Sequence, residues 1–309
     1  MYTHGSNSQS PKTKLTQMRV LQPSPLKQVE ALRTFERSLN LMYLHRYEEC
    51  ATSFLKCIEL NNWSHSLYYY IAGSCYIELY RLAQASKDPE QHAKAESHAT
   101  RAQELMDIVP QHLGKKKFMA RQLPFDVFVG RKLAKWHARA EARKCSFIDA
   151  VGISPINEMC YFWSGYTRMA DPELEDSLAR LEWSTKQPTW SSEPADEKAV
   201  YSLLTGTCQR FLGQLTTAKR TLQEGALAKD MAALRQCPHP DTWPAPVGHY
   251  EMAVCLWQEA GGENGDKADL KACSDELAKV ERAESYDLDA RVGLKITTAR
   301  ETLRRFGIT

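Results

Sequence analysis

Between residues 32 and 60, apolar side chains recur at the spacing of amphipathic helices, and this feature constrains the fold more than any other. The first part of the stretch has apolar residues at steps of three and four: Leu32, Phe35, Leu39 and Met42. After a short turn the same spacing returns: Tyr47, Cys50, Phe54 and Cys57. Each set occupies one face of a helix. Two helices joined by so short a turn lie antiparallel, so the stretch predicts a helical hairpin.

The spacing also resembles that of the tetratricopeptide repeat (TPR), in which small residues let helices approach closely and one aromatic ring fills the notch between them. A free thiol meets this demand because it packs as a small hydrophobe. The residues that fit the repeat pattern in two parts of the chain are Cys50, Phe54, Cys57, Ala72, Gly73 and Tyr76, and then Gly206, Ala218 and Leu222. We therefore expect an all-α fold, in which TPR-like helical hairpins form a curved, solenoid-like array.

Composition and helix-breaking residues divide the chain into a polar N-terminus at 1–25, expected to be disordered, and a helical repeat domain at 26–309. Within that domain we expect hairpins at about 26–110, a basic central helical segment at 115–186, and hairpins with a closing helix at 197–306. In the central segment, Ser154 is placed to cap a helix that runs from Pro155 to about Met169. Glu158 lies near the capping-box position of that helix.

The chain has 309 residues, of which 43% are hydrophobic and 25% charged, as in soluble globular proteins. No stretch approaches the ~18–20 apolar residues of a membrane-spanning helix, and the first 20 residues lack the pattern of a signal peptide. Nine cysteines without a C-x-x-C pair indicate reduced thiols in a cytosolic or nuclear protein.

Charge is unevenly distributed, although the net charge is only +2. Residues 115–144 contain ten basic residues against two acidic ones, whereas residues 251–289 contain eleven acidic residues against four basic ones. The basic run is the candidate interaction surface, carried by Lys115, Lys116, Lys117, Arg121, Arg131, Lys132, Lys135 and Arg139. It could attract anionic lipid head groups or an acidic protein, or direct nuclear import. The alternative is a solvated helix face that the acidic C-terminal region partly neutralises.

The sequence offers little for catalysis or ligand binding. It lacks the common catalytic and nucleotide-binding motifs, so we expect no enzyme, no cofactor and no small-molecule substrate. Cys237, His239 and His249 are too few and too loosely spaced for zinc, and no nucleic-acid-binding motif accompanies the basic run. The aromatic runs 68–70 and 161–163 fit core positions better than a groove. Tyr68 and Tyr70 cannot share the stripe of Tyr69, so one or both are candidates to face a groove or solvent.

Three segments carry a resemblance to a known family: residues 121–126 (RQLPFD), 152–159 (GISPINEM) and 294–299 (LKITTA). They are similar to signatures of the tetratricopeptide repeat protein 39 family, whose fungal members are named inclusion body clearance proteins. The resemblance covers about residues 29–305 and corresponds to the C-terminal portion of longer family members.

This resemblance implies a non-enzymatic, all-helical adaptor that helps to clear inclusions of misfolded proteins. Its partners would be lipid-droplet proteins and misfolded clients, in the cytoplasm, the nucleus and at the mitochondrial outer membrane. The basic run leaves a second possibility open. The chain would then associate peripherally with an organelle membrane, either the mitochondrial outer membrane or a lipid droplet, through the basic helix at 115–144.

Overall fold

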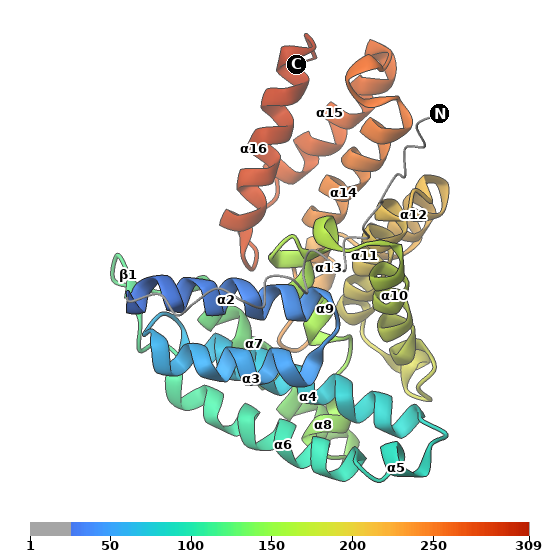
Figure 1. The fold of residues 1–309 in the computed structure, drawn as a ribbon. Coiled ribbons are helices and arrows are strands. Elements are labelled where there is room, and N and C mark those ends of the chain that lie inside the picture. The colour runs from blue at the N-terminus through green and yellow to red at the C-terminus, as the bar shows by residue number, and fades with distance from the viewer. Residues whose placement is uncertain (1–25, 309) are drawn as a thin grey trace, which may run out of the picture.

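The computed structural model describes residues 26–308, and the N-terminal region for which disorder is predicted lies outside them. The described chain is an all-α array of helices, with one short β-hairpin (Figure 1). The first helices are α2 (Lys27–Tyr43), α3 (Tyr47–Leu60), α4 (His65–Ala85), α5 (Pro89–His92) and α6 (Ala95–Ile108). Helix α2 packs on α3, α3 on α4, and α4 on α6, which is the sequential stacking of helical hairpins.

The aromatic ring of Phe54 fills the notch between the first helices. It is fully buried and meets Phe35 of α2 at 6.1 Å between ring centres and Tyr68 of α4 at 5.9 Å. Cys50 and Cys57 flank it on α3 and are also fully buried. The small residues thus lie where close approach of the helices requires them.

Helix α4 is the central element of this region, because other helices cover it on several sides. It contacts α3, α6, α7 and α9. Ala72 is fully buried, and a Cβ on Gly73 would lie only 3.1 Å from the Met106 side chain of α6, so the two helices approach closely at this glycine. Tyr76 is partly buried against His98.

The expectation that Tyr68 or Tyr70 faces a groove or solvent is wrong. The exposed fractions of these two side chains are 1% and 0%, whereas Tyr69 is only partly buried. A helix that is covered on several sides buries more than one stripe, so a single amphipathic face does not describe α4.

The middle of the chain begins with η1 (Val109–His112) and a hairpin of strands β1 (Lys117–Phe118) and β2 (Arg121–Gln122). It continues through α7 (Pro124–Arg143), α8 (Phe147–Ala150), α9 (Pro155–Phe162), η2 (Gly165–Arg168), α10 (Asp171–Thr185) and η3 (Trp190–Ser192). Ser154 caps α9 by accepting a hydrogen bond from the Asn157 amide at 3.3 Å. The predicted extension of this helix to Met169 is wrong, because Ser164 adopts a left-handed conformation (φ 55°) that ends it.

The second clear repeat consists of α11 (Ala195–Phe211), α12 (Leu215–Thr221) and the π-helical turn η4 (Leu222–Ala226). A Cβ on Gly206 of α11 would lie 2.8 Å from Leu222 Cγ and 3.3 Å from the Ala218 carbonyl oxygen. The two helices can therefore approach so closely only because residue 206 is glycine. Ser202 of α11 supports the π-helical turn, since its hydroxyl accepts a hydrogen bond from the Ala226 amide at 3.0 Å.

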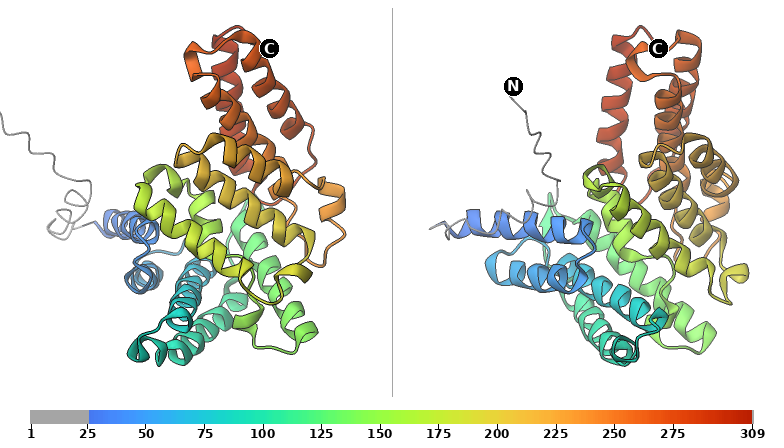
Figure 2. Two further views of the ribbon diagram at one scale, coloured as in Figure 1. Left: turned by 90° about the vertical axis from the view of Figure 1, so that its right-hand side faces the viewer. Right: turned by 45° about the vertical axis from the view of Figure 1, so that its right-hand side comes forward.

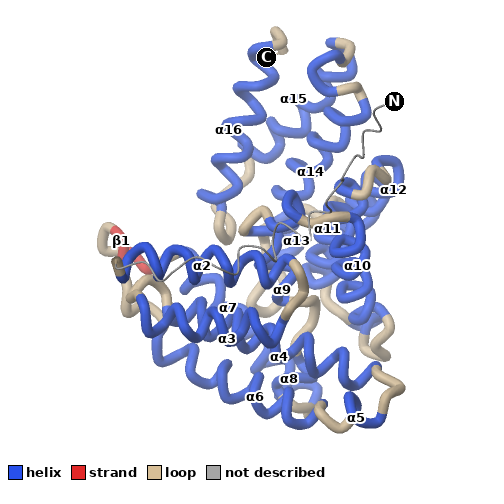
Figure 3. Tube along the Cα trace, viewed as in Figure 1, coloured by secondary structure: helices blue, strands red, loops and turns tan. Residues whose placement is uncertain are grey.

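The last elements are α13 (Met231–Leu234), α14 (Pro244–Glu259), η5 (Gly262–Asn264), α15 (Lys267–Glu281) and α16 (Asp289–Arg305). Helices α14–α16 stand at one end of the molecule and α2–α6 at the other, with α7 and α9–α12 between them (Figures 1 and 2). Helices form most of the described chain, and loops form most of the rest (Figure 3). One cluster of buried hydrophobic residues reaches from Phe35 in α2 to Ile308, so the two ends share a continuous core.

Candidate functional site

The basic helix α7 directs most of its charge into the protein. Arg131, Lys132, Lys135 and Arg139 follow one another at steps of one, three and four, which places their side chains on one side of the helix. The exposed fractions of the Lys132 and Lys135 side chains are 0% and 3%, and those of Arg131 and Arg139 are 16% and 11%. This side of α7, the charged face, is thus largely removed from water.

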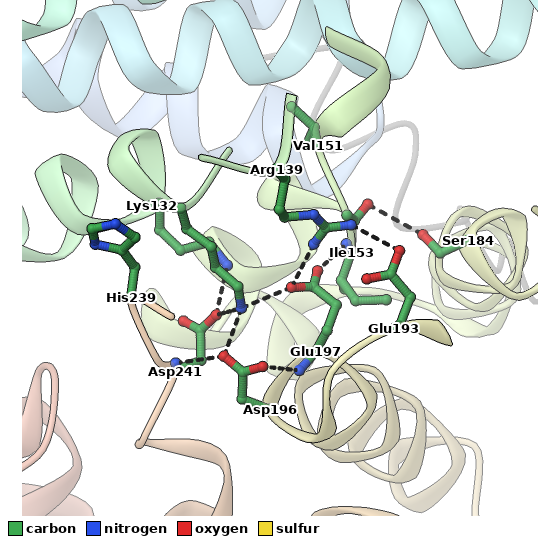
Figure 4. Close-up of polar contacts among 12 residues, drawn as sticks. Lys132, Arg139, Val151, Ile153, Ser184, Glu193, Asp196, Glu197, His239 and Asp241 are labelled. Atoms are coloured by element: carbon green, nitrogen blue, oxygen red, sulfur yellow. Dashed lines mark hydrogen bonds and ion pairs between the residues drawn. The ribbon is translucent and has the colours of Figure 1, made fainter. Parts of the chain in front are cut away.

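Carboxylates from distant parts of the chain meet the two lysines (Figure 4). Lys135 Nζ lies 2.7 Å from Asp196 Oδ2, 2.8 Å from Glu197 Oε2 and 2.7 Å from Asp241 Oδ2. Lys132 Nζ lies 2.8 Å from Glu158 Oε1 and 3.3 Å from the same oxygen of Asp241. Asp241 therefore bridges both lysines.

Arginines extend this network on both sides of the lysines. Arg131 Nη2 lies 2.8 Å from Asp241 Oδ1 and 2.7 Å from Asp287, just before α16. Arg139 contacts Glu197 at 3.0 Å and Glu193 at 2.8 Å. The charged face of α7 consequently joins α9, the start of α11 and the loops that precede α14 and α16.

The pKa values follow from burial opposed by opposite charge. Burial disfavours ionised Asp241, but the surrounding Arg131, Lys132 and Lys135 outweigh it and hold the pKa of this carboxyl well below its usual value. At Glu158 the effect of burial is larger, because Lys132 is the one cation close to it in the described chain, and the pKa rises to about 7. The opposing carboxylates also outweigh burial at Lys132 and raise its pKa, so Lys132 is charged at neutral pH, while Glu158 titrates there.

The prediction that Lys132 and Lys135 lie on an interaction surface is wrong, because carboxylates bury both. Arg131 and Arg139 are also held by internal ion pairs, with only a small part of each side chain exposed. Neutralisation by the acidic C-terminal region at 251–289 accounts for only one contact, that of Asp287. The remaining carboxylates lie between residues 158 and 241.

Sequence reasoning missed these carboxylates, and for Glu158 it assigned a different role. Glu158 does not complete a capping box but pairs with Lys132 inside the protein. Asp196 and Glu197 stand in the first turn of α11, where acidic residues are common for local reasons. One signal was available in the sequence: no acidic residue lies four positions before or after a lysine or arginine of this helix. Carboxylate partners for its charges therefore had to come from other parts of the chain.

The other four predicted surface residues do lie at the surface, on the hairpin before α7. Lys115, Lys116 and Lys117 are exposed, and so is Arg121. Strand residue Lys117 pairs with Gln122, and Phe118 pairs with Arg121.

The turn of this hairpin has an unusual backbone. Met119 and Ala120 adopt φ angles of 48° and 64°, a conformation that type I′ hairpin turns usually give to glycine or asparagine. The Met119 side chain at the tip is 83% exposed. We call residues 115–121 the basic hairpin.

Within residues 26–308, no group of three or more histidine, cysteine or acidic side chains is arranged to hold a metal ion. His249 Nδ1 instead lies 2.6 Å from Glu276. In the same part of the chain, no helix combines the length and the apolar character that crossing a membrane demands. The arrangement of charges at α7 is that of an internal clamp between helices.

Comparison with known proteins places this helical array in a family. The family model described as Iml2/Tetratricopeptide repeat protein 39 matches residues 5–212. The inclusion body clearance protein iml2 of Aspergillus fumigatus is 47% identical, in an alignment that covers 93% of this chain and 42% of that protein. The corresponding protein of Yarrowia lipolytica is 32% identical, over 91% of this chain and 39% of its own length.

The chain thus spans about two-fifths of the length of these curated relatives. No solved structure matches it. The match of the family model over more than half of the chain agrees with the stacked helical hairpins seen here. The chain therefore belongs to the Iml2/tetratricopeptide repeat protein 39 family.

Proposed function

We propose that the chain is a non-enzymatic adaptor that takes part in the clearance of misfolded-protein inclusions. The observation that carries this proposal is 47% identity, across 93% of the chain, to a protein named for inclusion body clearance. Stacked helical hairpins suit such a role because they present extended surfaces to other proteins.

The charged face of α7 supports an adaptor rather than a catalyst. Catalytic acids and bases must reach a substrate, whereas Lys132 and Lys135 are enclosed and are neutralised by carboxylates. Functional contacts then fall to the outer surfaces of the helices. By family resemblance, the proposed partners are lipid-droplet proteins and misfolded clients, met in the cytoplasm, the nucleus or at the mitochondrial outer membrane.

A chimera in Aspergillus fumigatus would test this proposal. In cells that lack their inclusion body clearance protein, the matching segment of that protein would be replaced by this chain. The number of fluorescent inclusions of a misfolding reporter would then be followed after folding stress. We expect the chimera to restore clearance, as the intact relative does. A chimera that accumulates to normal levels yet leaves the inclusions in place would contradict the proposal.

A second candidate function is peripheral membrane contact. Because the charges of α7 are largely buried, the segment proposed for this contact is now the basic hairpin. Its four cations are exposed, and in sequence they flank Met119, which is also exposed. Each basic residue close to an anionic membrane contributes roughly 1 kcal/mol of attraction, and an apolar tip can enter the interface. This arrangement favours the hairpin over the rest of the basic run as a membrane-contacting element.

Sedimentation with vesicles would test the hairpin. We expect binding to phosphatidylserine-containing vesicles to fall with added salt and to be lost in the double variant Lys116→Glu plus Lys117→Glu. The matched control, Lys229→Glu plus Lys271→Glu, changes the same charge at exposed positions far along the chain and should still bind. Equal binding of both double variants would rule the hairpin out.

A further inference from the structure

Two basic residues of α16 lie against aromatic rings at the junction of α16 with α7, α9 and α14. The Arg291 guanidinium lies 4.2 Å from the centre of the Trp163 ring and 5.1 Å from that of Phe125. Lys295 Nζ lies 4.8 Å from the Tyr161 ring and 6.0 Å from that of Tyr250. Being four positions apart, the two cations occupy one face of the helix.

Neither cation has a carboxylate partner among residues 26–308, in contrast to the cations on the charged face of α7. Glu251 attracts Lys295 but is already occupied. It accepts a hydrogen bond from the Tyr161 hydroxyl at 2.8 Å and one from Arg210 Nε at 2.9 Å. Arg291 Nε is buried, and no residue of the described chain accepts its hydrogen bond.

The environment of these two residues disfavours their charge. Both side chains are about half-buried, and burial lowers the pKa of Arg291 and of Lys295 below their ordinary values. Residues 1–25 contain no aspartate or glutamate, so their side chains offer no counterion either. Two neighbouring, partly desolvated cations without an anion are expected where an anion binds from outside.

We propose that Arg291 and Lys295 bind an extended acidic segment of a partner protein, with acidic residues at alternate positions. Residues four apart on a helix are separated by about 6 Å. Alternate side chains of an extended peptide lie about 6.5–7 Å apart on one side, which matches that spacing. This inference rests on the proposed adaptor role, because it names the chemistry of a partner.

Neighbouring apolar groups define what else the segment would carry. Leu294, which lies between the two cations in sequence, is 72% exposed. From Trp163, aromatic contacts continue through Phe35 at 5.2 Å to Trp63, which is half-exposed, with 5.9 Å between the last two rings. An apolar or aromatic residue beside the acidic pair would pack on this surface. The half-buried cations favour a slender peptide over the flat surface of a membrane.

Fluorescence polarisation with short labelled peptides would test the proposal on the full chain. The probe carries the core Phe-Asp-Ser-Glu, and its control carries Phe-Asn-Ser-Gln. We expect the acidic peptide to bind, and the variant Arg291→Gln plus Lys295→Gln to weaken binding more than about tenfold, because two charge-assisted hydrogen bonds are lost. The variant Arg304→Gln plus Arg305→Gln removes the same charge from exposed positions of the same helix and should bind normally.

Several outcomes would overturn the proposal. One is equal binding of the acidic and amide peptides, and another is equal binding of the two double variants. A third outcome is that binding to phosphatidylserine vesicles requires Arg291 and Lys295, whereas binding of the peptide does not. A large loss of thermal stability in the Arg291→Gln plus Lys295→Gln variant would also overturn it, since the two cations would then be structural. Absence of peptide binding together with restored clearance in the chimera would refute this site alone and leave the adaptor role standing.

Discussion

Two interfaces of this protein are both buried, but apolar side chains fill one and charged side chains fill the other. Between α2, α3 and α4, the buried groups are aromatic rings and thiols around Phe54. Between α7 and the second half of the molecule, they are ions centred on Lys135 and Asp241. When a substitution shortens a side chain at an apolar interface, the loss of stability grows with the apolar area or volume that is removed. An ionic interface must be complete, because one missing partner leaves its counterpart charged, buried and alone.

The difference also concerns how far along the chain the partners come from. Phe54 meets residues of the helices immediately before and after its own. Lys132 reaches Asp241, 109 positions away, and Lys135 reaches Asp196, 61 positions away. The apolar interface stacks neighbouring hairpins, whereas the ionic interface joins α7 to segments far along the chain. Mutations at the two interfaces should therefore differ in size and in pH dependence.

The largest effect is expected from Lys135→Ala, which leaves Asp196, Glu197 and Asp241 without their shared cation. We expect the free energy of unfolding to fall by about 5 kcal/mol, at the upper end for a broken buried ion pair. Urea denaturation followed by circular dichroism would measure it. Lys116→Ala on the exposed basic hairpin is the control and should change stability by less than ~0.5 kcal/mol. A loss below about 1 kcal/mol for Lys135→Ala would mean that water reaches these carboxylates.

Phe54→Ala should follow, with a loss of about 3–4 kcal/mol from lost burial and the cavity that remains. The milder Phe54→Leu keeps most of the apolar volume and should cost less than about 1.5 kcal/mol. The same denaturation experiment compares both variants. If the Phe54→Ala and Phe54→Leu variants were equally stable, the apolar volume at position 54 would not be what stabilises the packing of α2, α3 and α4.

At Gly206 we expect a smaller effect, due to overpacking. Gly206→Ala places a Cβ against Leu222 and should cost about 1–3 kcal/mol. Gly293→Ala is its matched control, since nothing lies within 4 Å of the added Cβ in α16, and it should stabilise the helix by about 0.5–1 kcal/mol. Opposite shifts of the thermal midpoint would support the close approach of α11 and α12. Shifts of the same sign would contradict it.

The titration of Glu158 has the smallest effect for a single step in pH, although the effect adds up over several pH units. Its pKa is raised to about 7 in the folded chain from an ordinary value of 4.5, so the folded state holds more protons between these values. Stability from this group is therefore present below about pH 4.5 and is lost as the pH rises through 7, by roughly 1 kcal/mol per pH unit at most.

Glu158→Gln cannot lose a proton and isolates this contribution. Urea denaturation from pH 5 to pH 8 should show the parent chain losing stability relative to the variant as the pH rises. Parallel curves for the two proteins would contradict the raised pKa. Parallel curves are also what an ionised Glu158, held by Lys132, would give, because an ordinary or lowered pKa lies below this pH range.

Much of the fold could be predicted because its signals are local. Periodic apolar residues indicated the hairpin that α2 and α3 form, and the small residues of the repeats indicated which helices approach closely. Local signals failed at α4, where contacts on several sides buried Tyr68 and Tyr70 as well. They failed again at α9, which ends at Phe162 because the backbone turns at Ser164 and not because the apolar pattern stops.

By itself, the sequence determined the all-helical repeat architecture, the family and the exposed cations of the basic hairpin. The tertiary structure decided whether the charges that follow on α7 are exposed or buried. Among residues 26–308, it also left Arg291 and Lys295 beside aromatic rings without a carboxylate partner. The physical reason is that hydrophobic periodicity reports burial within a few residues along the chain. Whether a lysine is solvated or enclosed depends on carboxylates that only folding brings to it, such as Asp241 at Lys132 and Lys135.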